Sequence, residues 1–233
     1  MTVDVDDVLD PLETITGRGF SRFDVFRDWV SLMLAALQRN DDEYLGVLER
    51  YDGGRDRQRR NRNADQFSEA YGELMAAMRR TNRDALGVAY EEFGMASDSF
   101  GQHFTPHPVA KAMAELQTTG GDTDPPVTIA DPACGSGRLL ILAARQQDEP
   151  VVCFGQDKDK LCAQIAALNL CFFNIDGVIV YGDSLKVDKR RAWRTQGTAA
   201  GGEVEEVDPS EVSWPEAAFE PREDAETDSE VVE

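Results

Sequence analysis

The spacing of hydrophobic residues changes along the chain and divides it into two parts. In the first part apolar residues recur every three or four positions, as Phe26, Val30 and Met33 do, which predicts a bundle of amphipathic helices. A polar stretch, residues 1–20, precedes these helices and is predicted to be loose. The predicted helices cover residues 23–37, 41–51, 64–80 and 83–95.

From about residue 127 the apolar runs become short and alternate with helical runs. VTIA, PVVCFGQ and GVIVYGD have the character of buried strands, and GRLLILAARQQ and KDKLCAQIAALNLCFFN have helical periods. This β-α-β-α-β order with short connections predicts a parallel sheet with crossover helices. The basic run KVDKRRAWRTQG and the acidic sequence after it contain few core residues, so they are predicted to be disordered.

These patterns together predict an α/β protein in three segments. Residues 1–95 are expected to form an N-terminal helical domain, and residues 96–187 a core of about three parallel strands. Residues 188–233 are expected to form a basic and then acidic disordered tail.

The chain is strongly acidic, with a formal net charge of −20 and a sequence pI of about 4.4. Residues 203–233 hold −12 of this charge, so the remaining residues still carry −8. Acidity spread in this way keeps a protein soluble where salt screens its charges, which favours a halophilic, cytoplasmic protein. The alternative interpretation is an ordinary domain with an acidic tail.

The sequence also bears on membranes and metals. The N-terminus lacks an apolar signal segment, and no apolar run reaches the ~18 residues of a membrane span, so neither secretion nor a membrane location is expected. The cysteines have no C-x-x-C spacing and the chain has 2 histidines, which argues against a zinc site. The four cysteines are predicted to be small buried residues in a reducing compartment: Cys134, Cys153, Cys162 and Cys171.

The stretch TIADPACGSGRLLILAA joins a predicted strand, a glycine-rich turn and a helix. Such a turn presents backbone N–H groups and the positive end of a helix to a ligand, and Gly135 and Gly137 allow the backbone to approach it closely. The spacing is neither that of a P-loop nor that of the dinucleotide fingerprint. Asp131, just before the turn, suits a ligand with a cationic amine.

Two more carboxylates follow the next two predicted strands. Asp157 lies where such folds place an acid against ribose hydroxyls, and Asp183 could accept a hydrogen bond from an adenine amino group. Parallel strands end at one edge of a sheet, so the three acids are expected to line one pocket. In the alternative interpretation they only cap the helices that follow.

Four ordered segments carry a family resemblance: GQHFTPHPVAKAMAEL, DPACGSGRLLILAA, GQDKD followed by LNL, and GDSL. They resemble the S-adenosylmethionine motifs of N6-adenine-specific DNA methyltransferases, most closely the modification subunits of type I restriction systems. The resemblance covers about residues 100–185. It implies a Rossmann-like methyltransferase core, S-adenosyl-L-methionine as the cofactor and double-stranded DNA as the substrate.

The resemblance also implies the roles of individual residues. Phe104, Thr105 and Pro106 would flank the methionine moiety, and Asp157 would bind the ribose. The amino-acid end of the cofactor would be lined by Asp131, Ala133, Gly135, Ser136 and Gly137. The adenine would lie against Asp183, Ser184 and Leu185.

The resemblance assigns no catalytic residue, because one motif is missing. Adenine N6 methylation uses an [Asn/Asp/Ser]-Pro-Pro-aromatic loop that holds the target amino group and stacks on the flipped base. The chain's Pro-Pro pair lies in DPPV, Asp124 to Val127, directly before the first predicted strand, and Val127 cannot stack on a base. We interpret DPPV as a rigid lead into that strand, and expect an enzyme that is incomplete or depends on a partner.

The predicted sheet leaves the first strand, residues 128–130, at an edge. Bare apolar edges are normally covered or paired, so we expect this edge to be covered by the EVSW segment near the C-terminus, by a partner chain or by a second copy. DNA contact is expected from basic residues that would neutralise phosphates, although the same residues could simply offset an acidic surface. They form a loop and a second cluster: Arg55, Arg57, Arg59, Arg60 and Arg62, then Lys186, Lys189, Arg190, Arg191 and Arg194.

Three functional hypotheses follow. The first is an adenine-specific DNA methyltransferase that is truncated or completed by another chain. The second is a catalytically silent S-adenosylmethionine-binding subunit of a DNA-modification or anti-restriction complex. The third, a helical interaction protein with a decayed cofactor fold, is disfavoured because the cofactor motifs are intact.

Overall fold

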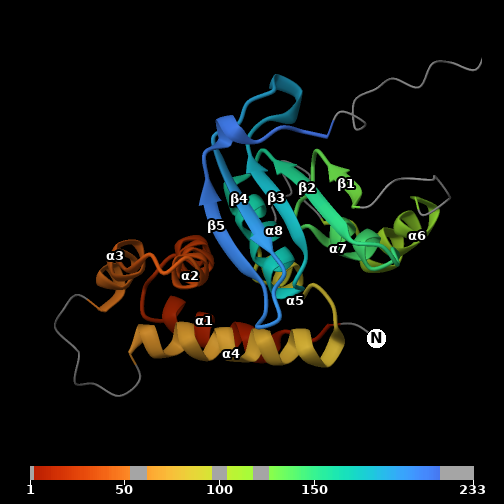
Figure 1. Cartoon of the computed structure of the whole chain (residues 1–233). Helices are drawn as coiled ribbons and strands as arrows, with labels where there is room; N and C mark the ends of the chain where they lie inside the picture. The colour runs from red at the N-terminus through yellow and green to blue at the C-terminus, as the bar shows by residue number, and fades with distance from the viewer. Residues whose placement is uncertain (1–2, 53–61, 96–103, 118–125, 216–233) are drawn as a thin grey trace, which may run out of the picture.

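The computed structural model describes residues 3–52, 62–95, 104–117 and 126–215, which form helices around one mixed sheet (Figure 1). The helices are α1 (Asp6–Thr16), α2 (Arg22–Leu37), α3 (Asp41–Asp52), α4 (Asn63–Thr81), α5 (Ala85–Glu92), α6 (His107–Gln117), α7 (Arg138–Ala144) and α8 (Lys160–Phe172). The strands are β1 (Val127–Asp131), β2 (Val151–Asp157), β3 (Asp176–Tyr181), β4 (Arg191–Gln196) and β5 (Glu203–Val207). Two short 3-10 turns are η2 (Ser184–Lys186) and η3 (Pro209–Glu211).

The sheet has the order β1-β2-β3-β4-β5. The pairs β1–β2 and β2–β3 are parallel, so the expected β-α-β-α-β arrangement with crossover helices α7 and α8 is confirmed. The register sets Asp131 opposite Gly155 and Asp157 opposite Tyr181. The carboxyl ends of the three parallel strands therefore meet at one edge of the sheet.

The prediction of disorder after residue 187 is wrong for residues 191–207. They form β4 and β5, an antiparallel hairpin that continues the sheet from β3. Along β4, Ala192, Trp193 and Thr195 are buried while Arg194 is exposed and pairs with Glu205 across the hairpin. The high charge of this segment concealed a hairpin because the charged side chains occupy solvent-facing positions. The end of the acidic tail, residues 216–233, lies outside the described residues.

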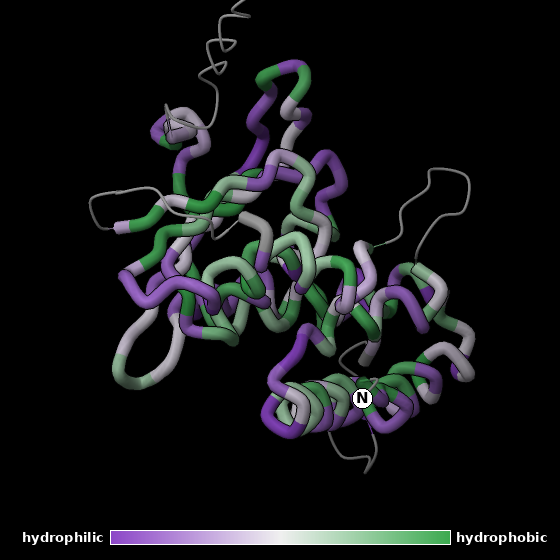
Figure 2. The backbone as a smooth tube through the Cα atoms, turned by 90° about the vertical axis from the view of Figure 1, so that its right-hand side faces the viewer, coloured by the Kyte–Doolittle hydropathy of each residue, from purple (hydrophilic) through white to green (hydrophobic). Residues whose placement is uncertain are grey.

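The prediction that residues 1–20 are loose is also wrong, because α1 lies within them. Its apolar residues recur at helical spacing and are buried against α4 and α2: Val8, Leu9, Leu12 and Ile15. Acidic residues between these positions lower the mean hydropathy of the segment without disturbing the apolar face. In Figure 2, α1 and α4 lie at the bottom, and hydrophobic and hydrophilic residues alternate around their turns.

Helix α8 joins the helical part of the molecule to the sheet. Its residues 161–171 are all buried, because it contacts α2 and α5 on one side and β2 to β5 on the other. A helix that is apolar on every face requires such complete enclosure. Most buried residues of the helical part and of α8 consequently share one hydrophobic cluster with Cys153, Ile179, Trp193 and Val204 of the sheet. Val180 and Ala192 belong to a separate cluster with Val212.

Strand β1 is an edge of the sheet, as expected: in the described part of the chain it pairs only with β2. The expectation that the EVSW segment covers this edge is wrong, because the segment does not pair with β1 and is held against a face of the sheet at β2. Trp214 donates a hydrogen bond to Gln156 Oε1 at 3.0 Å and its ring packs against Phe154, both residues of β2. Pairing of the β1 edge by another chain stays a prediction.

Candidate ligand-binding site

The three acids predicted from the strand ends lie at the same edge of the sheet. Asp131 is the last residue of β1, Asp157 is the last residue of β2, and Asp183 follows β3 by two residues. The backbone N–H of Gly182 donates to the carbonyl oxygen of Asp157 at 2.9 Å, which joins the second and third strand ends directly. The three acids therefore lie at one edge of the sheet, as the sequence predicted, and their lining of one pocket stays a prediction.

The hydrogen bonds of the carboxylates separate the two interpretations of these acids. Asp183 Oδ1 accepts from the N–H of Leu185 at 3.1 Å and caps η2, so the capping alternative describes it correctly. Asp157 instead accepts from Gly135 N–H at 2.9 Å through Oδ2 and from Asp159 N–H at 2.8 Å through Oδ1. The residue that caps α8 is Asp159 and not Asp157, so the capping alternative does not describe Asp157.

The surroundings of the acids shift their pKa values in opposite directions. Burial raises the pKa of Asp131 above its ordinary value of 3.8. Burial also raises the pKa of Asp157, against the lowering effect of its two backbone hydrogen bonds, and the nearby Asp159 and Asp131 add to the rise. The pKa of Asp183 is lowered, mainly by its hydrogen bond with Lys186. A cationic or hydroxyl-rich ligand would stabilise the ionised forms of the first two acids.

The glycine-rich turn between β1 and α7 approaches its neighbours so closely that side chains are excluded. Gly135 and Gly137 have φ angles of +54° and +76°, a conformation that other residues rarely adopt. A Cβ atom at Gly135 would lie 2.8 Å from Cδ1 of Phe104, and one at Gly137 would lie 3.3 Å from Cβ of Ala166. The turn thus fits between α8 and the HFTP segment, of which the structure describes Phe104, Thr105 and Pro106.

The HFTP segment contributes one ring to this arrangement. Phe104 is half-buried beside Gly135, and its ring centroid lies 5.0 Å from that of Tyr90 in α5. Thr105 and Pro106 are exposed just before α6 begins at His107. Their exposure leaves them accessible to a ligand at the turn.

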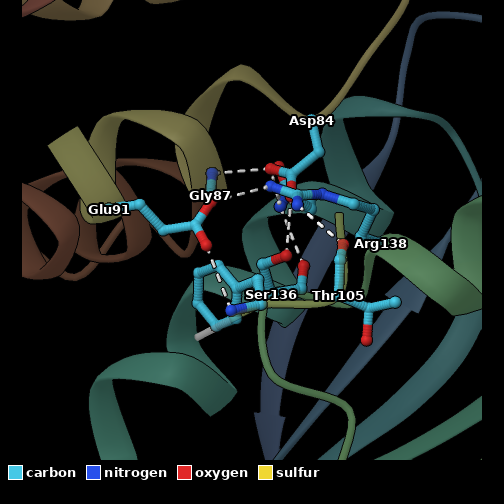
Figure 3. Close-up of polar contacts among 8 residues, drawn as sticks. Asp84, Gly87, Glu91, Thr105, Ser136 and Arg138 are labelled. Carbon is cyan, nitrogen blue, oxygen red and sulfur yellow. Dashed lines mark hydrogen bonds and ion pairs between the residues drawn. The ribbon is translucent and has the colours of Figure 1, made fainter. Parts of the chain in front are cut away.

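Sequence reasoning missed a buried polar network behind the turn (Figure 3). Asp84 caps α5, is 5% exposed and accepts from Ser136 Oγ at 2.6 Å and from Arg138 Nε at 3.1 Å. Asn169 Nδ2 also donates to Asp84, at 2.8 Å, and to the carbonyl oxygen of Ser136, at 2.9 Å. The sequence signals were weak: Asp84 has the pattern of a helix cap, and Asn169 lies in the LNL motif that was noted only for its family resemblance.

The remaining predicted cofactor residues lie on the surface of the turn and of η2. Ala133 is exposed and its N–H donates to Asp131 Oδ1 at 3.0 Å. Ser184 is partly buried, while the side chain of Leu185 is 95% exposed. Leu185 thus offers an uncovered apolar surface next to Asp183.

The two predicted basic clusters differ in how much of each the structure describes. Arg55, Arg57, Arg59 and Arg60 lie outside the described residues, and Arg62 pairs with Asp65 at the start of α4. In the second cluster Lys189 donates to the carbonyl of Val212, Arg190 pairs with Asp188, and Arg191 and Arg194 pair with Glu206 and Glu205. These internal pairs favour the alternative in which the second cluster offsets local acidic charge.

All four cysteines are free and buried, as predicted. Within residues 3–52, 62–95, 104–117 and 126–215, no group of three or more His, Cys, Asp or Glu is placed to hold a metal ion. The same residues contain no helix that is long and apolar enough to cross a membrane.

Together, the parallel strands, the glycine-rich turn and the acids at the strand ends define an α/β protein of the S-adenosylmethionine-dependent methyltransferase class. Residues 81–201 match the model of the family N-6 DNA Methylase, and the chain belongs to this family. The matched region begins before α5 and ends after β4.

Relatives in Methanocaldococcus jannaschii support the same family. The chain is 32% identical over 122 residues to the methylase subunit of type I restriction enzyme MjaVII, covering 48% of this chain and 20% of that protein. It is 35% identical over 111 residues to the MjaVIII methylase subunit, covering 44% and 18%. The matched region therefore spans about a fifth of the length of these relatives.

Two solved structures resemble the chain at low identity. A Listeria monocytogenes protein assigned to the class I S-adenosylmethionine-dependent methyltransferases is 16% identical with a TM-score of 0.47, covering 78% of this chain and 54% of that one. The methyltransferase subunit of a type I restriction-modification system from Streptococcus thermophilus is 23% identical with a TM-score of 0.41, covering 78% and 40%.

Proposed function

We propose that this chain is the cofactor-binding part of an adenine-N6 DNA methyltransferase of the restriction-modification type. The observation that carries the proposal is the hydrogen bond from Gly135 N–H to Asp157 Oδ2, which joins the glycine-rich turn to the acid at the end of the next strand. S-adenosyl-L-methionine fits these carboxylate acceptors, because it has a cationic amine, a sulfonium and a ribose that donates hydrogen bonds to carboxylates.

The residues divide between the parts of the cofactor. Asp131 and the turn from Ala133 to Gly137 would hold the amino-acid end, beside Phe104, Thr105 and Pro106. Asp157 would accept from the ribose hydroxyls. Asp183, Ser184 and Leu185 would bind the adenine, with Leu185 supplying apolar surface. Bound in this way, the cofactor supplies the methyl group, and the chain's own residues orient it.

The target base needs a second element. Methyl transfer to N6 is a direct displacement in which positioning dominates, and a flipped adenine requires a polar group and a stacking ring. Val127 starts β1 in the structure, while Asp124 and Pro125 lie outside the described residues, so DPPV as a rigid lead into that strand stays our interpretation. We propose that another polypeptide segment supplies the target-base loop.

The β1 edge is where that segment would join the sheet. Strand β1 carries Asp131 at its end, and its far side has no paired strand among the described residues. A strand added there would end beside the cofactor site, at the same edge as Asp131. A second copy of this chain is the other candidate for covering this edge.

The substrate is proposed to be double-stranded DNA, and the setting a cytoplasm of high salt. The net charge of −20 repels DNA at low ionic strength, whereas concentrated salt screens that repulsion. Arg191 and Arg194 pair with glutamates of β5, and Arg62 pairs with Asp65, so these three are the weaker candidates for phosphate contact. Contact through Arg55, Arg57, Arg59 and Arg60 stays a prediction from the sequence.

A second function is favoured by the missing loop. The chain would then bind S-adenosylmethionine within a DNA-modification or anti-restriction complex without transferring methyl itself. The two proposals differ in one measurable product, N6-methyladenine.

The experiment is a methyl-transfer assay on unmethylated double-stranded DNA in concentrated KCl, with labelled S-adenosylmethionine. The chain is tested alone and with the products of neighbouring genes, and light scattering reports whether they associate. Labelled N6-methyladenine formed only in the presence of an associated partner supports the first function. Cofactor binding without methyl transfer in any combination supports the second, and absence of cofactor binding refutes both.

A further inference from the structure

The buried network behind the glycine-rich turn joins elements that are far apart in sequence. Asp84 belongs to the helical part, Ser136 and Arg138 to the turn and the start of α7, and Asn169 to α8. Each carboxylate oxygen of Asp84 has two donors: Gly87 N–H at 2.6 Å and Asn169 Nδ2 on Oδ1, and Ser136 Oγ and Arg138 Nε on Oδ2. A buried carboxylate satisfied in this way fixes the relative positions of all its donors.

A second part of the network extends to the HFTP segment. The Nη1 atom of Arg138 donates to the carbonyl oxygen of Thr105 at 2.9 Å, and its Nη2 atom lies 3.5 Å from Glu91 Oε2. The other oxygen of Glu91, Oε1, accepts from the backbone N–H of Phe104 at 3.1 Å. The backbone of residues 104–105 is therefore held from two sides, by one residue of α5 and one of α7.

These contacts have a direct consequence for the turn. The ring of Phe104 lies against Gly135, and Tyr90 of α5 supports the ring from behind. Asp84, Tyr90 and Glu91 all come from the helical part, within about two turns of α5 and its cap. They touch the turn or the HFTP segment, and none of them was predicted to be in the cofactor site.

We propose that Glu91, Arg138 and Asp84 are positioning residues for the cofactor: through them α5 sets where the HFTP segment lies against the glycine-rich turn. The assignment rests on the proposed function for the identity of the ligand. It goes further by placing the helical part of the chain in the cofactor site, so that the affinity for S-adenosylmethionine depends on α5. The HFTP segment and the turn would both bind the methionine end, so the effect is confined to that end of the ligand.

Glu91 is the best residue to test, because its side chain is 28% exposed and its removal leaves the Asp84 cluster in place. Glu91→Ala removes the acceptor for Phe104 N–H and the partner of Arg138, whereas Glu91→Gln keeps an acceptor oxygen. Glu92→Ala is the matched control, since Glu92 is the exposed neighbour on the same helix. S-adenosylmethionine binding is measured by calorimetry, and adenosine binding by ligand-detected NMR titration. The midpoint of urea unfolding is measured without ligand.

The expected result is a loss of roughly tenfold in S-adenosylmethionine affinity for Glu91→Ala, with a smaller loss for Glu91→Gln. Adenosine affinity and the Glu92→Ala control should match the wild type. Unchanged S-adenosylmethionine affinity in Glu91→Ala would overturn the assignment. So would an equal loss of affinity for both ligands together with a lowered unfolding midpoint, because that result indicates a structural role alone. A wild-type chain that binds neither ligand would overturn the proposed function itself, and this assignment with it.

Discussion

Asp157 at the end of β2 accepts a hydrogen bond at 2.9 Å from the backbone N–H of Gly135, in the turn that follows β1. The bond spans 22 residues of sequence and fixes the position of the turn relative to the second strand. The same carboxylate is proposed to bind the ribose of the cofactor. By this proposal one side chain would both shape the site and contact the ligand.

Replacing Asp157 should therefore weaken cofactor binding strongly. Hydrogen bonds to charged groups contribute about 1.5–3 kcal/mol, so Asp157→Ala is expected to lower S-adenosylmethionine affinity by about 10- to 100-fold. Calorimetry measures the effect, and Asp148→Ala, at an exposed turn position, serves as the control. If Asp157→Ala binds the cofactor as tightly as the wild type, the site is elsewhere.

A methyl group at Gly135 should damage the turn in two separable ways. Gly135→Ala forces alanine into a left-handed conformation, which costs about 1–2 kcal/mol, and places its Cβ against the ring of Phe104. Gly94→Ala has a similar φ of +73° with nothing within 4 Å of the new Cβ, so it isolates the backbone cost. Urea unfolding should show a larger loss for Gly135→Ala. Equal losses for the two variants would mean that Phe104 does not pack on the turn.

Cofactor binding should weaken in mild acid. The pKa values of Asp131 and Asp157 are raised above 3.8 by burial, so these groups take up protons at a higher pH in the folded chain than in the unfolded chain. The protonated carboxyls lose their attraction for a cationic amine, and affinity should fall as the pH is lowered from neutrality through the raised pKa values. At pH values above the raised pKa values, burial of the ionised carboxylates disfavours the folded state. As the pH falls from neutrality toward these pKa values, the stability of the ligand-free chain should therefore not fall in parallel with the affinity.

Calorimetry in buffers of different ionisation enthalpy should accordingly detect proton release on binding within this window. The measurement is repeated on Asp157→Asn, in which one of the two titrating groups is absent. The same proton release in the variant and the wild type would show that Asp157 does not titrate on binding.

The hairpin of β4 and β5 should contribute to the free energy of unfolding. Trp193 is 1% exposed, and removing a buried tryptophan costs about 3–5 kcal/mol, so Trp193→Ala should lower stability by that amount. Arg194→Ala changes the next residue of the strand, which is exposed, and should cost far less. Urea denaturation in concentrated KCl compares them. A negligible effect of Trp193→Ala would restore the prediction that this segment is disordered.

Salt should stabilise the chain if its acidity is an adaptation to a halophilic cytoplasm. With a net charge of −20, self-repulsion is screened as the Debye length falls from about 10 Å at 0.1 M to about 3 Å at 1 M salt. The unfolding midpoint is expected to rise steadily with KCl, and to rise less with an uncharged osmolyte of equal osmolality. A midpoint that is independent of KCl would favour the ordinary acidic tail.

The local features of the site could be predicted from sequence because they depend on residues close together in the chain. The alternation of short apolar runs with helical runs was sufficient for the three parallel strands, and Gly135 and Gly137 marked a turn that only glycine adopts readily. Parallel strands end at one edge, so the positions of Asp131 and Asp157 followed from topology alone. Disorder was predicted wrongly for residues 191–207, because their charged composition concealed the positions that the hairpin buries.

The support of the site could not be predicted, because it joins residues that only the tertiary structure brings together. The bond from Arg138 to Asp84 spans 54 residues and that from Asn169 to Asp84 spans 85. No local pattern distinguishes Asp84, buried and fully hydrogen-bonded, from any acid that caps a helix. The sequence by itself determined the three parallel strands, the turn and the acids at the strand ends. Only packing decided that a carboxylate from the helical part would lie behind the turn, since a buried charge is tolerated only where donors surround it.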